Sequence, residues 1–202
     1  MKIAILNYNI GNLSSVQNAL SALGADGRII SKSDEVATFD KLILPGVGAF
    51  GDAMAHLNQS GMNEAIKDFA KSGKYMLGIC LGMQLLMDKS YEFGEFDGLG
   101  LIKGEVVKFE SSNLKIPQMG WNRIEFMQKS ALLNNIPEGA FLYFVHSFYV
   151  KNQNSENVVA TCDYGVKFSA IIQKDNIFGI QPHPEKSAKI GLKILENFIN
   201  LK

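Results

Sequence analysis

The chain has 202 residues, of which 47% are hydrophobic, so it can bury one substantial core, and we expect a single domain spanning residues 1–202. Lys and Arg together equal Asp and Glu, which leaves no basic face of the kind that a nucleic-acid partner requires. The first apolar run is too short for a signal peptide or a membrane span, so we expect a cytoplasmic protein that does not contact membranes.

The first half of the chain predicts a parallel sheet covered by helices. Short aliphatic runs read as strands, and apolar side chains at helical spacing indicate helices between them. Continuous apolar strands that alternate with helices are typical of a sheet buried on both faces. The predicted strands are residues 2–7, 28–30, 41–44 and 75–79, and the predicted helices are residues 13–23, 50–58 and 63–71.

After Gly100 the pattern changes to longer strand-like runs separated by turn residues. We expect these runs to continue the sheet with antiparallel strands, and a final amphipathic helix to close the domain. The predicted strands are residues 106–109, 122–127, 141–150 and 158–162, followed by a hairpin of residues 168–173 and 177–181 and a helix over residues 187–201. The predicted fold is therefore α/β, a doubly wound, flavodoxin-like mixed sheet with an antiparallel extension.

Cys80 has the setting of a nucleophile. It follows a predicted strand and precedes an apolar helical segment, with Gly78 two positions before it and Gly82 two positions after it. A sharp turn between a strand and a helix strains the nucleophile and crowds its neighbours, so both flanking positions favour glycine. A lone cysteine is more often part of the packing, as Cys162 in its plain strand context is expected to be. The two spaced glycines favour chemistry at Cys80.

His183 is the candidate base. It lies between two prolines directly after a predicted strand, and Glu185 follows at the second position. Extended geometry points the side chains of positions i and i+2 the same way, so the carboxylate can orient the imidazole while the other ring nitrogen faces the thiol. Taken alone, this segment would be only a rigid surface turn. Together with Cys80 it predicts a catalytic triad. His56 reads as an ordinary helix residue.

A second glycine loop, Gly46-Val47-Gly48, follows the third predicted strand. It lacks the Lys and Ser or Thr spacing of a phosphate loop. One reading is a structurally tight turn. The other is that its amides approach a ligand and complete an oxyanion hole begun by the amide of Leu81.

Together these segments resemble the class I, triad-type glutamine amidotransferases, and among them the glutaminase subunits of imidazole glycerol phosphate synthase. The resemblance covers essentially the whole chain, and its specificity comes from the order of the motifs. They are NYNIGN at residues 7–12, PGVGAF at 45–50, GICLGMQ at 78–84, GLGL at 98–101, MGWN at 119–122, YFVHSFY at 143–149 and PHPEKS at 182–187.

The resemblance implies a role for each matching position. Cys80 is the expected nucleophile, His183 the base and acid, and Glu185 its orienting partner, while Gly46, Val47 and Leu81 form the oxyanion hole. The residues expected to hold glutamine are Gly48, Gln84, Glu92, Ser147 and Phe148, with Glu95 as a competitor for Glu92. The residues expected to meet a partner are Asn12, Trp121, Asn122, Tyr143 and Lys186.

The resemblance also implies a reaction and a partner. The substrate is glutamine, and the ammonia passes to a (β/α)8-barrel cyclase, bound as a heterodimer, for imidazole glycerol phosphate synthesis in histidine biosynthesis. We expect neither a cofactor nor a metal. One departure concerns Gln118, where the family usually has histidine. Because glutamine cannot titrate near neutral pH, the change suggests a variant interface or a paralogue that supplies ammonia for surface sugars. A stand-alone cysteine amidase or peptidase and a non-catalytic module are two competing hypotheses.

Overall fold

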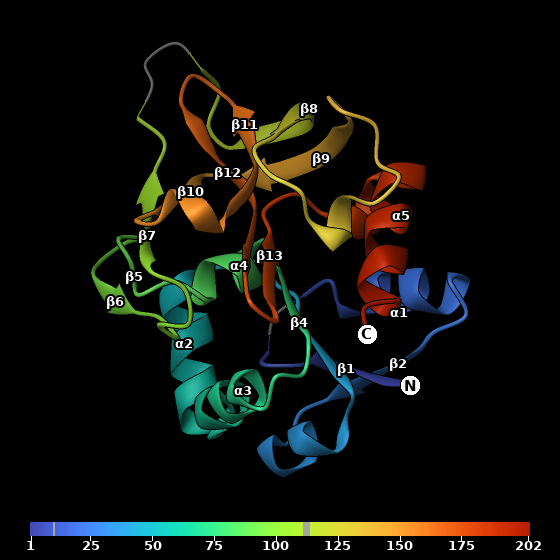
Figure 1. Cartoon of the computed structure of the whole chain (residues 1–202). Helices are drawn as coiled ribbons and strands as arrows, with labels where there is room; N and C mark the ends of the chain where they lie inside the picture. The colour runs from blue at the N-terminus through green and yellow to red at the C-terminus, as the bar shows by residue number, and fades with distance from the viewer. Residues whose placement is uncertain (10, 111–113) are drawn as a thin grey trace.

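The computed structural model describes residues 1–9, 11–110 and 114–202, so Ile10 of the first motif lies outside the described residues. A sheet in the order β2-β1-β3-β4-β13-β12-β11-β8-β9 runs through the molecule (Figure 1). Neighbouring strands from β2 to β13 are parallel, and those from β13 to β9 are antiparallel, which confirms the predicted fold. The strands are β1 (Lys2–Leu6), β2 (Asp26–Ile30), β3 (Lys41–Leu44), β4 (Met76–Ile79), β8 (Gln118–Phe126), β9 (Phe141–His146), β11 (Val158–Asp163), β12 (Lys167–Lys174) and β13 (Ile177–Ile180).

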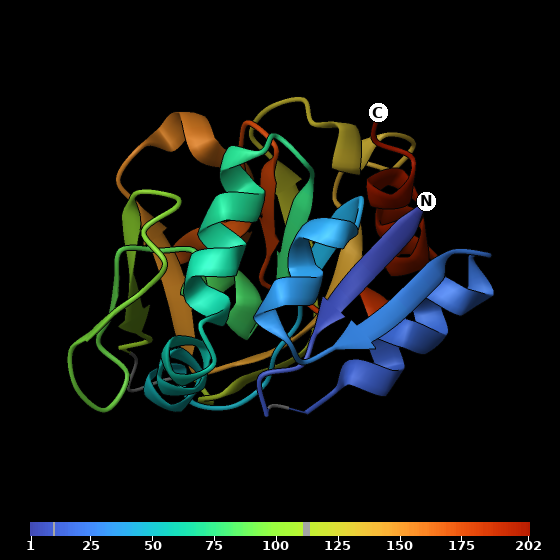
Figure 2. The ribbon, with the colours of Figure 1, turned by 90° about the horizontal axis from the view of Figure 1, so that it is seen from below.

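The central parallel strands β1, β3, β4 and β13 are largely apolar because both of their faces are covered. In β1, Ala4 and Leu6 pack into one core cluster, whereas Ile3 and Ile5 pack into a second one on the opposite face. All four side chains are fully buried. Figure 2 shows α1 and α5 on one side of the strands and α2 and α3 on the other. This two-sided burial follows from the period of two along a strand.

The helices match the sequence expectations closely, apart from their ends. Among the described residues between Gly100 and the last helix, the only helical segments are short 3-10 turns. Within residues 1–9, 11–110 and 114–202, no helix combines the length and apolarity that crossing a membrane requires. The helices are α1 (Leu13–Ala22), α2 (Phe50–Gln59), α3 (Met62–Lys71), α4 (Leu81–Leu85) and α5 (Ala188–Ile199), and the 3-10 turns are η1 (Ser33–Thr38), η2 (Ala131–Leu133), η3 (Ser155–Asn157) and η4 (Pro184–Lys186).

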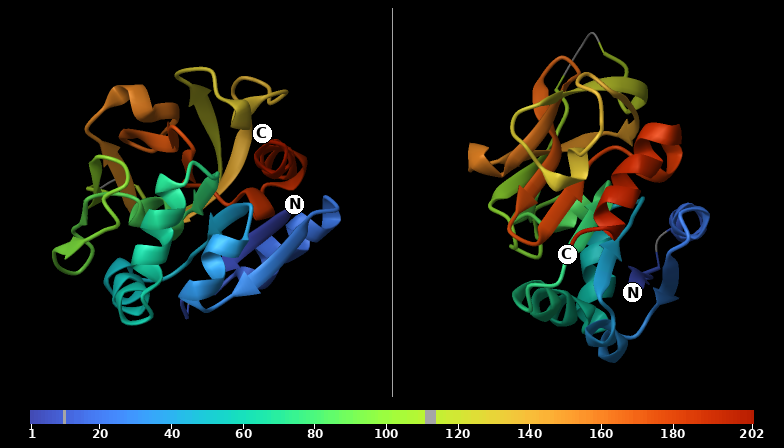
Figure 3. Two further views of the ribbon diagram at one scale, coloured as in Figure 1. Left: turned by 60° about the horizontal axis from the view of Figure 1, so that its bottom comes forward. Right: turned by 45° about the vertical axis from the view of Figure 1, so that its right-hand side comes forward.

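A second, four-stranded sheet corrects one expectation. Residues 106–109 do not extend the large sheet, and residues 141–150 are not one strand. β9 ends at His146, and after Ser147 the chain enters β10, which pairs with β7 in the small sheet. This sheet lies on the side of the molecule away from α1 and α5 (Figure 3, left). Its strands, in the order β10-β7-β5-β6, are β5 (Lys89–Ser90), β6 (Phe96–Asp97), β7 (Gly104–Lys108) and β10 (Phe148–Asn152).

Lys41 ties the last helix to the sheet. Its side chain is buried in β3, and Nζ donates hydrogen bonds to the carbonyls of Phe198, Ile199 and Leu201 at distances of 2.7–2.8 Å. The last carbonyls of a helix have no partner within it, and a cation there also complements the helix dipole. Lys41 therefore fixes the C-terminal end of α5, the helix that follows the candidate base in the chain.

Candidate active site

Cys80 lies at the sharp turn between β4 and α4. Its φ of 53° and ψ of −109° are strained for a residue with a side chain. The flanking glycines are required by close packing: a Cβ on Gly82 would lie 1.7 Å from the carbonyl oxygen of Leu44, and one on Gly78 would lie 2.6 Å from the carbonyl of Gly82. The elbow geometry predicted from the glycine spacing is confirmed.

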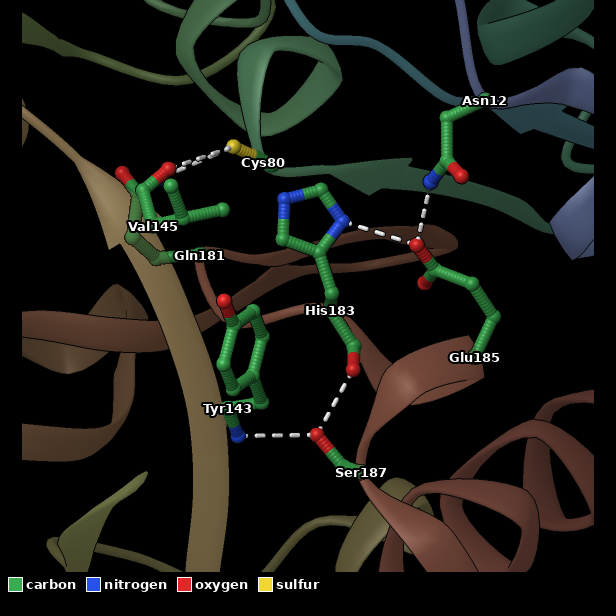
Figure 4. Close-up of polar contacts among 8 residues, drawn as sticks. All are labelled: Asn12, Cys80, Tyr143, Val145, Gln181, His183, Glu185 and Ser187. Carbon is green, nitrogen blue, oxygen red and sulfur yellow. Dashed lines mark hydrogen bonds and ion pairs between the residues drawn. The ribbon is translucent and has the colours of Figure 1, made fainter. Parts of the chain in front are cut away.

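His183 and Glu185 meet as the spacing predicts. His183 follows β13, the parallel neighbour of β4, so the ends of these two strands bring the histidine to the cysteine. Nδ1 of His183 donates to Oε1 of Glu185 over 2.8 Å, and both side chains are fully buried. Figure 4 shows the other ring nitrogen of His183 facing Cys80. The three side chains therefore have the geometry of a catalytic triad.

The electrostatics of His183 favour its charged form. Burial lowers the pKa of His183, but hydrogen bonds and charge interactions with Cys80 and Glu185 outweigh it and raise the pKa to about 10. The imidazole of His183 is therefore held in its charged form between the sulfur of Cys80 and the carboxylate of Glu185. A thiolate is the reactive nucleophile.

A cavity of about 290 Å³ opens at Cys80. It brings together the sequence-predicted residues Gly48, Gln84, Glu92, Ser147 and Phe148, which come from four separate segments of the chain. Its lining is Val47, Gly48, Cys80, Leu81, Gln84, Glu92, Pro117, Val145, His146, Ser147 and Phe148.

Of the two acidic candidates, Glu92 lines the cavity and Glu95 does not. Glu92 accepts a hydrogen bond of 2.6 Å from the amide of Phe50, and partial burial raises the pKa of Glu92. Glu95 is exposed and pairs with Lys89 in the small sheet. Of the two, only Glu92 can therefore meet an ammonium group in this cavity.

The expected oxyanion hole is not open. The Leu81 amide donates a hydrogen bond of 3.4 Å to the carbonyl oxygen of Gly46, so a carbonyl occupies the donor that an oxyanion would need. Val47 follows at the wall of the cavity. The buried Tyr8 hydroxyl donates to the carbonyl of Pro45, which anchors the start of this loop. The glycine loop and Leu81 are adjacent, as predicted. In this structure, however, the Gly46 carbonyl oxygen points toward the Leu81 amide and accepts its hydrogen bond.

The residues expected to meet a partner lie on β8, β9, α1 and η4. Trp121 is 49% exposed, and its ring packs edge-on against that of Tyr143, its register partner, with centroids 6.2 Å apart. Asn122 follows in β8, and Lys186 is exposed at the end of η4. Asn12, at the start of α1, donates to Oε1 of Glu185. This face therefore adjoins the triad directly.

Gln118 does not contribute to this face. It is fully buried, and its side-chain amide points to the sulfur of Cys162 at 3.9 Å. The alternation of β8 explains the difference, because Met119 and Trp121 point outward while Gln118 points inward. Gln118 is therefore not itself exposed on the face that carries Trp121, and the variant interface stays a prediction.

Sequence reasoning missed three residues near the triad. Gln181 contacts the Cys80 sulfur, and it shares the alternation that links His183 to Glu185, so the same argument could have found it. Ser187 accepts a hydrogen bond from the Tyr143 amide and donates one to the His183 carbonyl, as Figure 4 shows. Tyr8 carried no local signal for its contact with the glycine loop.

Comparisons with known proteins identify the family of this chain. Residues 4–201 match the family Glutamine amidotransferase class-I. Imidazole glycerol phosphate synthase subunit HisH of Wolinella succinogenes is 55% identical over 203 residues, covering 98% of this chain and 99% of that one. The subunit of the same name from Sulfurimonas denitrificans is 54% identical over 200 residues, covering 97% and 96%.

Solved structures share the fold at lower identity. The structure of PurLQS from Thermotoga maritima has a TM-score of 0.79 at 22% identity and covers 98% of this chain and 97% of its own. A crystal structure of a glutamine amidotransferase has a TM-score of 0.77 at 15% identity, and the match likewise covers 98% and 97%. From the family match and the full-length relatives, the chain belongs to the class-I glutamine amidotransferase family.

Proposed function

We propose that this chain is the glutaminase subunit of an imidazole glycerol phosphate synthase, which acts in the cytoplasm in histidine biosynthesis. Its partner is a (β/α)8-barrel cyclase, bound as a heterodimer. The names of the full-length relatives support this pathway over the surface-sugar alternative. The observation that carries the glutaminase activity is the buried set of Cys80, His183 and Glu185 beside a cavity that also contains Gln84 and Glu92.

The first half of the reaction releases ammonia. Glu92 pairs with the α-ammonium of glutamine and places the side-chain carboxamide against the thiolate of Cys80. The sulfur attacks the carboxamide carbon, and the carbonyl electron pair moves onto oxygen. As the tetrahedral species collapses, the imidazolium of His183 gives its proton to the leaving nitrogen, and ammonia departs. A thioester between Cys80 and the glutamyl group remains.

The second half releases glutamate. His183, now neutral, takes a proton from water, and the hydroxide attacks the thioester carbon. Collapse of the second tetrahedral species breaks the carbon–sulfur bond and returns the thiolate, with the imidazolium beside it. Glu185 keeps its charge throughout and holds the ring of His183 in the productive orientation.

The occupied oxyanion donor explains why a partner would be needed. While the Gly46 carbonyl accepts the Leu81 amide, neither tetrahedral species has that amide for its oxygen. Loss of one oxyanion donor typically costs a factor of about 10²–10³ in rate. We propose that docking of the cyclase against the face of Trp121 and Lys186 turns the loop and frees the donor. Ammonia is then made only where an acceptor site is ready for it.

The test uses the complex with a barrel cyclase from the same organism, supplied with either glutamine or ammonium salt. Cys80→Ala is expected to abolish product formation from glutamine but to keep it from ammonium, because the acceptor site is untouched. Cys162→Ala is the matched control, since Cys162 is also buried but lies away from the triad. Glutamine turnover that survives in the Cys80 variant would refute the assignment of the nucleophile.

The partner dependence is tested separately. Glutamate release by the isolated chain is expected to be slow and to rise by at least about 10²-fold in the complex. Lys186→Ala should loosen the coupling between glutamate release and product formation. If the isolated chain turns over glutamine as fast as the complex does, the gating is refuted and a stand-alone amidase becomes the better account.

A further inference from the structure

A buried glutamine touches the nucleophile from the side away from Glu185. Gln181 follows β13 and is fully buried, and its side-chain nitrogen lies 3.6 Å from the sulfur of Cys80. Its side-chain oxygen accepts a hydrogen bond of 3.1 Å from Nε2 of Gln84. Figure 4 shows Gln181 reaching the sulfur beside Val145, whose carbonyl is 4.0 Å from that atom.

The neighbours of Gln181 dictate which end of its amide faces the sulfur. Nε2 of Gln84 also donates to the carbonyl oxygen of Phe148 over 3.0 Å. A carbonyl can only accept, so the side-chain NH2 group of Gln84 must be the donor to Phe148. The same NH2 group faces Gln181, so the side-chain oxygen of Gln181 must be the acceptor. The NH2 group of Gln181 is then left to point at Cys80. The orientation follows from a chain of hydrogen bonds and not from an arbitrary choice of amide rotamer.

An amide N–H aimed at a sulfur stabilises the thiolate. The thiol is a weak acceptor, whereas an ionised sulfur accepts hydrogen bonds well, so a buried donor favours the charged form. The Cys80 sulfur thus has a neutral donor in Gln181 in addition to the imidazolium of His183. The Gln181 amide matters most after His183 has given up its proton. It still donates a hydrogen bond to the sulfur when the thioester breaks and negative charge returns to that atom.

We propose that Gln181 is a further catalytic residue of this site, whose amide holds the Cys80 sulfur as a thiolate and fixes it relative to the glutamine-binding side chain of Gln84. The proposal rests on the proposed glutaminase function. It also gives the sulfur and the substrate cavity a common support, since Gln181, Gln84 and the Phe148 carbonyl form one buried hydrogen-bonded series.

The decisive measurement is the pH dependence of Cys80 alkylation by iodoacetamide, followed by mass spectrometry on the Cys80 peptide of the full chain. Gln181→Met keeps the length of the side chain but removes its donor and its acceptor. We expect the midpoint of the alkylation profile to move up by about one pH unit, as the loss of one hydrogen bond to a charged group implies. Gln118→Met is the matched control, because Gln118 is an equally buried glutamine whose amide faces Cys162 instead. Its profile should coincide with that of the wild type.

Turnover in the cyclase complex provides the second measurement. Gln181→Met should lower kcat for glutamine about tenfold near neutral pH and recover toward the wild-type value as the pH rises, while product formation from ammonium stays unchanged. A Gln181→Met alkylation profile that coincides with the wild type overturns the proposal, even if turnover falls. If the wild-type complex does not hydrolyse glutamine at all, the proposed function fails instead, and the alkylation profiles still decide whether Gln181 acts on the sulfur.

Discussion

Replacing Glu185 with glutamine tests how this triad orients its histidine. Oε1 of Glu185 accepts from Nδ1 of His183 and also from the side-chain amide of Asn12. Two donors converge on one oxygen, so a glutamine here should keep its oxygen in that position and preserve the ring orientation. What it loses is the negative charge. A charge-assisted hydrogen bond exceeds a neutral one by about 1–1.5 kcal/mol, which corresponds to a roughly tenfold lower kcat/KM.

The assay is glutamate release by the cyclase complex, with ammonium-dependent synthesis as the check on docking. His183→Ala removes the proton carrier and should cost about 10³-fold or more. The double variant Asn12→Ala with Glu185→Gln frees the new amide to turn its NH2 group toward His183, which imposes the wrong tautomer, so its loss should exceed the product of the two single losses. If Glu185→Gln alone is as damaging as His183→Ala, the orienting role of Glu185 is refuted.

Three further predictions concern stability, measured by denaturant unfolding. Burial lowers the pKa of His146 to about 4, so between pH 6.5 and 4 only the unfolded chain binds a proton at this histidine. As the pH falls through this window, the free energy of unfolding of the wild type should drop by about 3 kcal/mol relative to that of His146→Gln. A difference that stays constant with pH would contradict the buried neutral form. Lys41→Met should cost about 2–4 kcal/mol, since three carbonyls at the end of α5 lose a charged donor, and a neutral effect would contradict this clamp. Gly82→Ala should cost about 3 kcal/mol or more because of its clash with Leu44, whereas Gly73→Ala, with open space around it, should cost about 1 kcal/mol for its positive φ; equal losses would contradict the packing argument.

The parallel half of the fold could be predicted from the sequence because its central strands are buried on both faces. In the run of residues 41–44, every residue after Lys41 is apolar, and the structure has β3 with the same bounds. The transfer of the chain between sheets could not be predicted. Along residues 142–150 every second side chain is buried, and this alternation continues without a break through Ser147, where the chain leaves the large sheet for the small one. A local period therefore does not reveal which sheet a strand joins.

The candidate site likewise has features that the sequence predicts and features that only the structure shows. The elbow at Cys80 and the pairing of His183 with Glu185 depend on positions two residues apart, and such spacings are visible in sequence. The contact of Asn12 with Glu185 joins positions 173 residues apart, and that of Gln181 with Cys80 spans 101. Only the topology of the sheet brings these pairs together. The glycines of the Gly46-Val47-Gly48 loop predict that its amides can turn away from the oxyanion position, but only the structure shows that the Gly46 carbonyl occupies the Leu81 amide.

The hydrogen bond between the Leu81 amide and the Gly46 carbonyl also decides which inhibitors can distinguish the free chain from a working complex. An aldehyde analogue of glutamine adds reversibly to Cys80 and leaves an oxygen that needs a donor. In the free chain that donor is taken and a carbonyl oxygen faces the adduct, so binding should be weak. An alkylating analogue forms a thioether at the same sulfur and creates no oxyanion, so it does not need the Leu81 amide. Aldehydes should therefore select the assembled enzyme, whereas alkylating agents should label both forms.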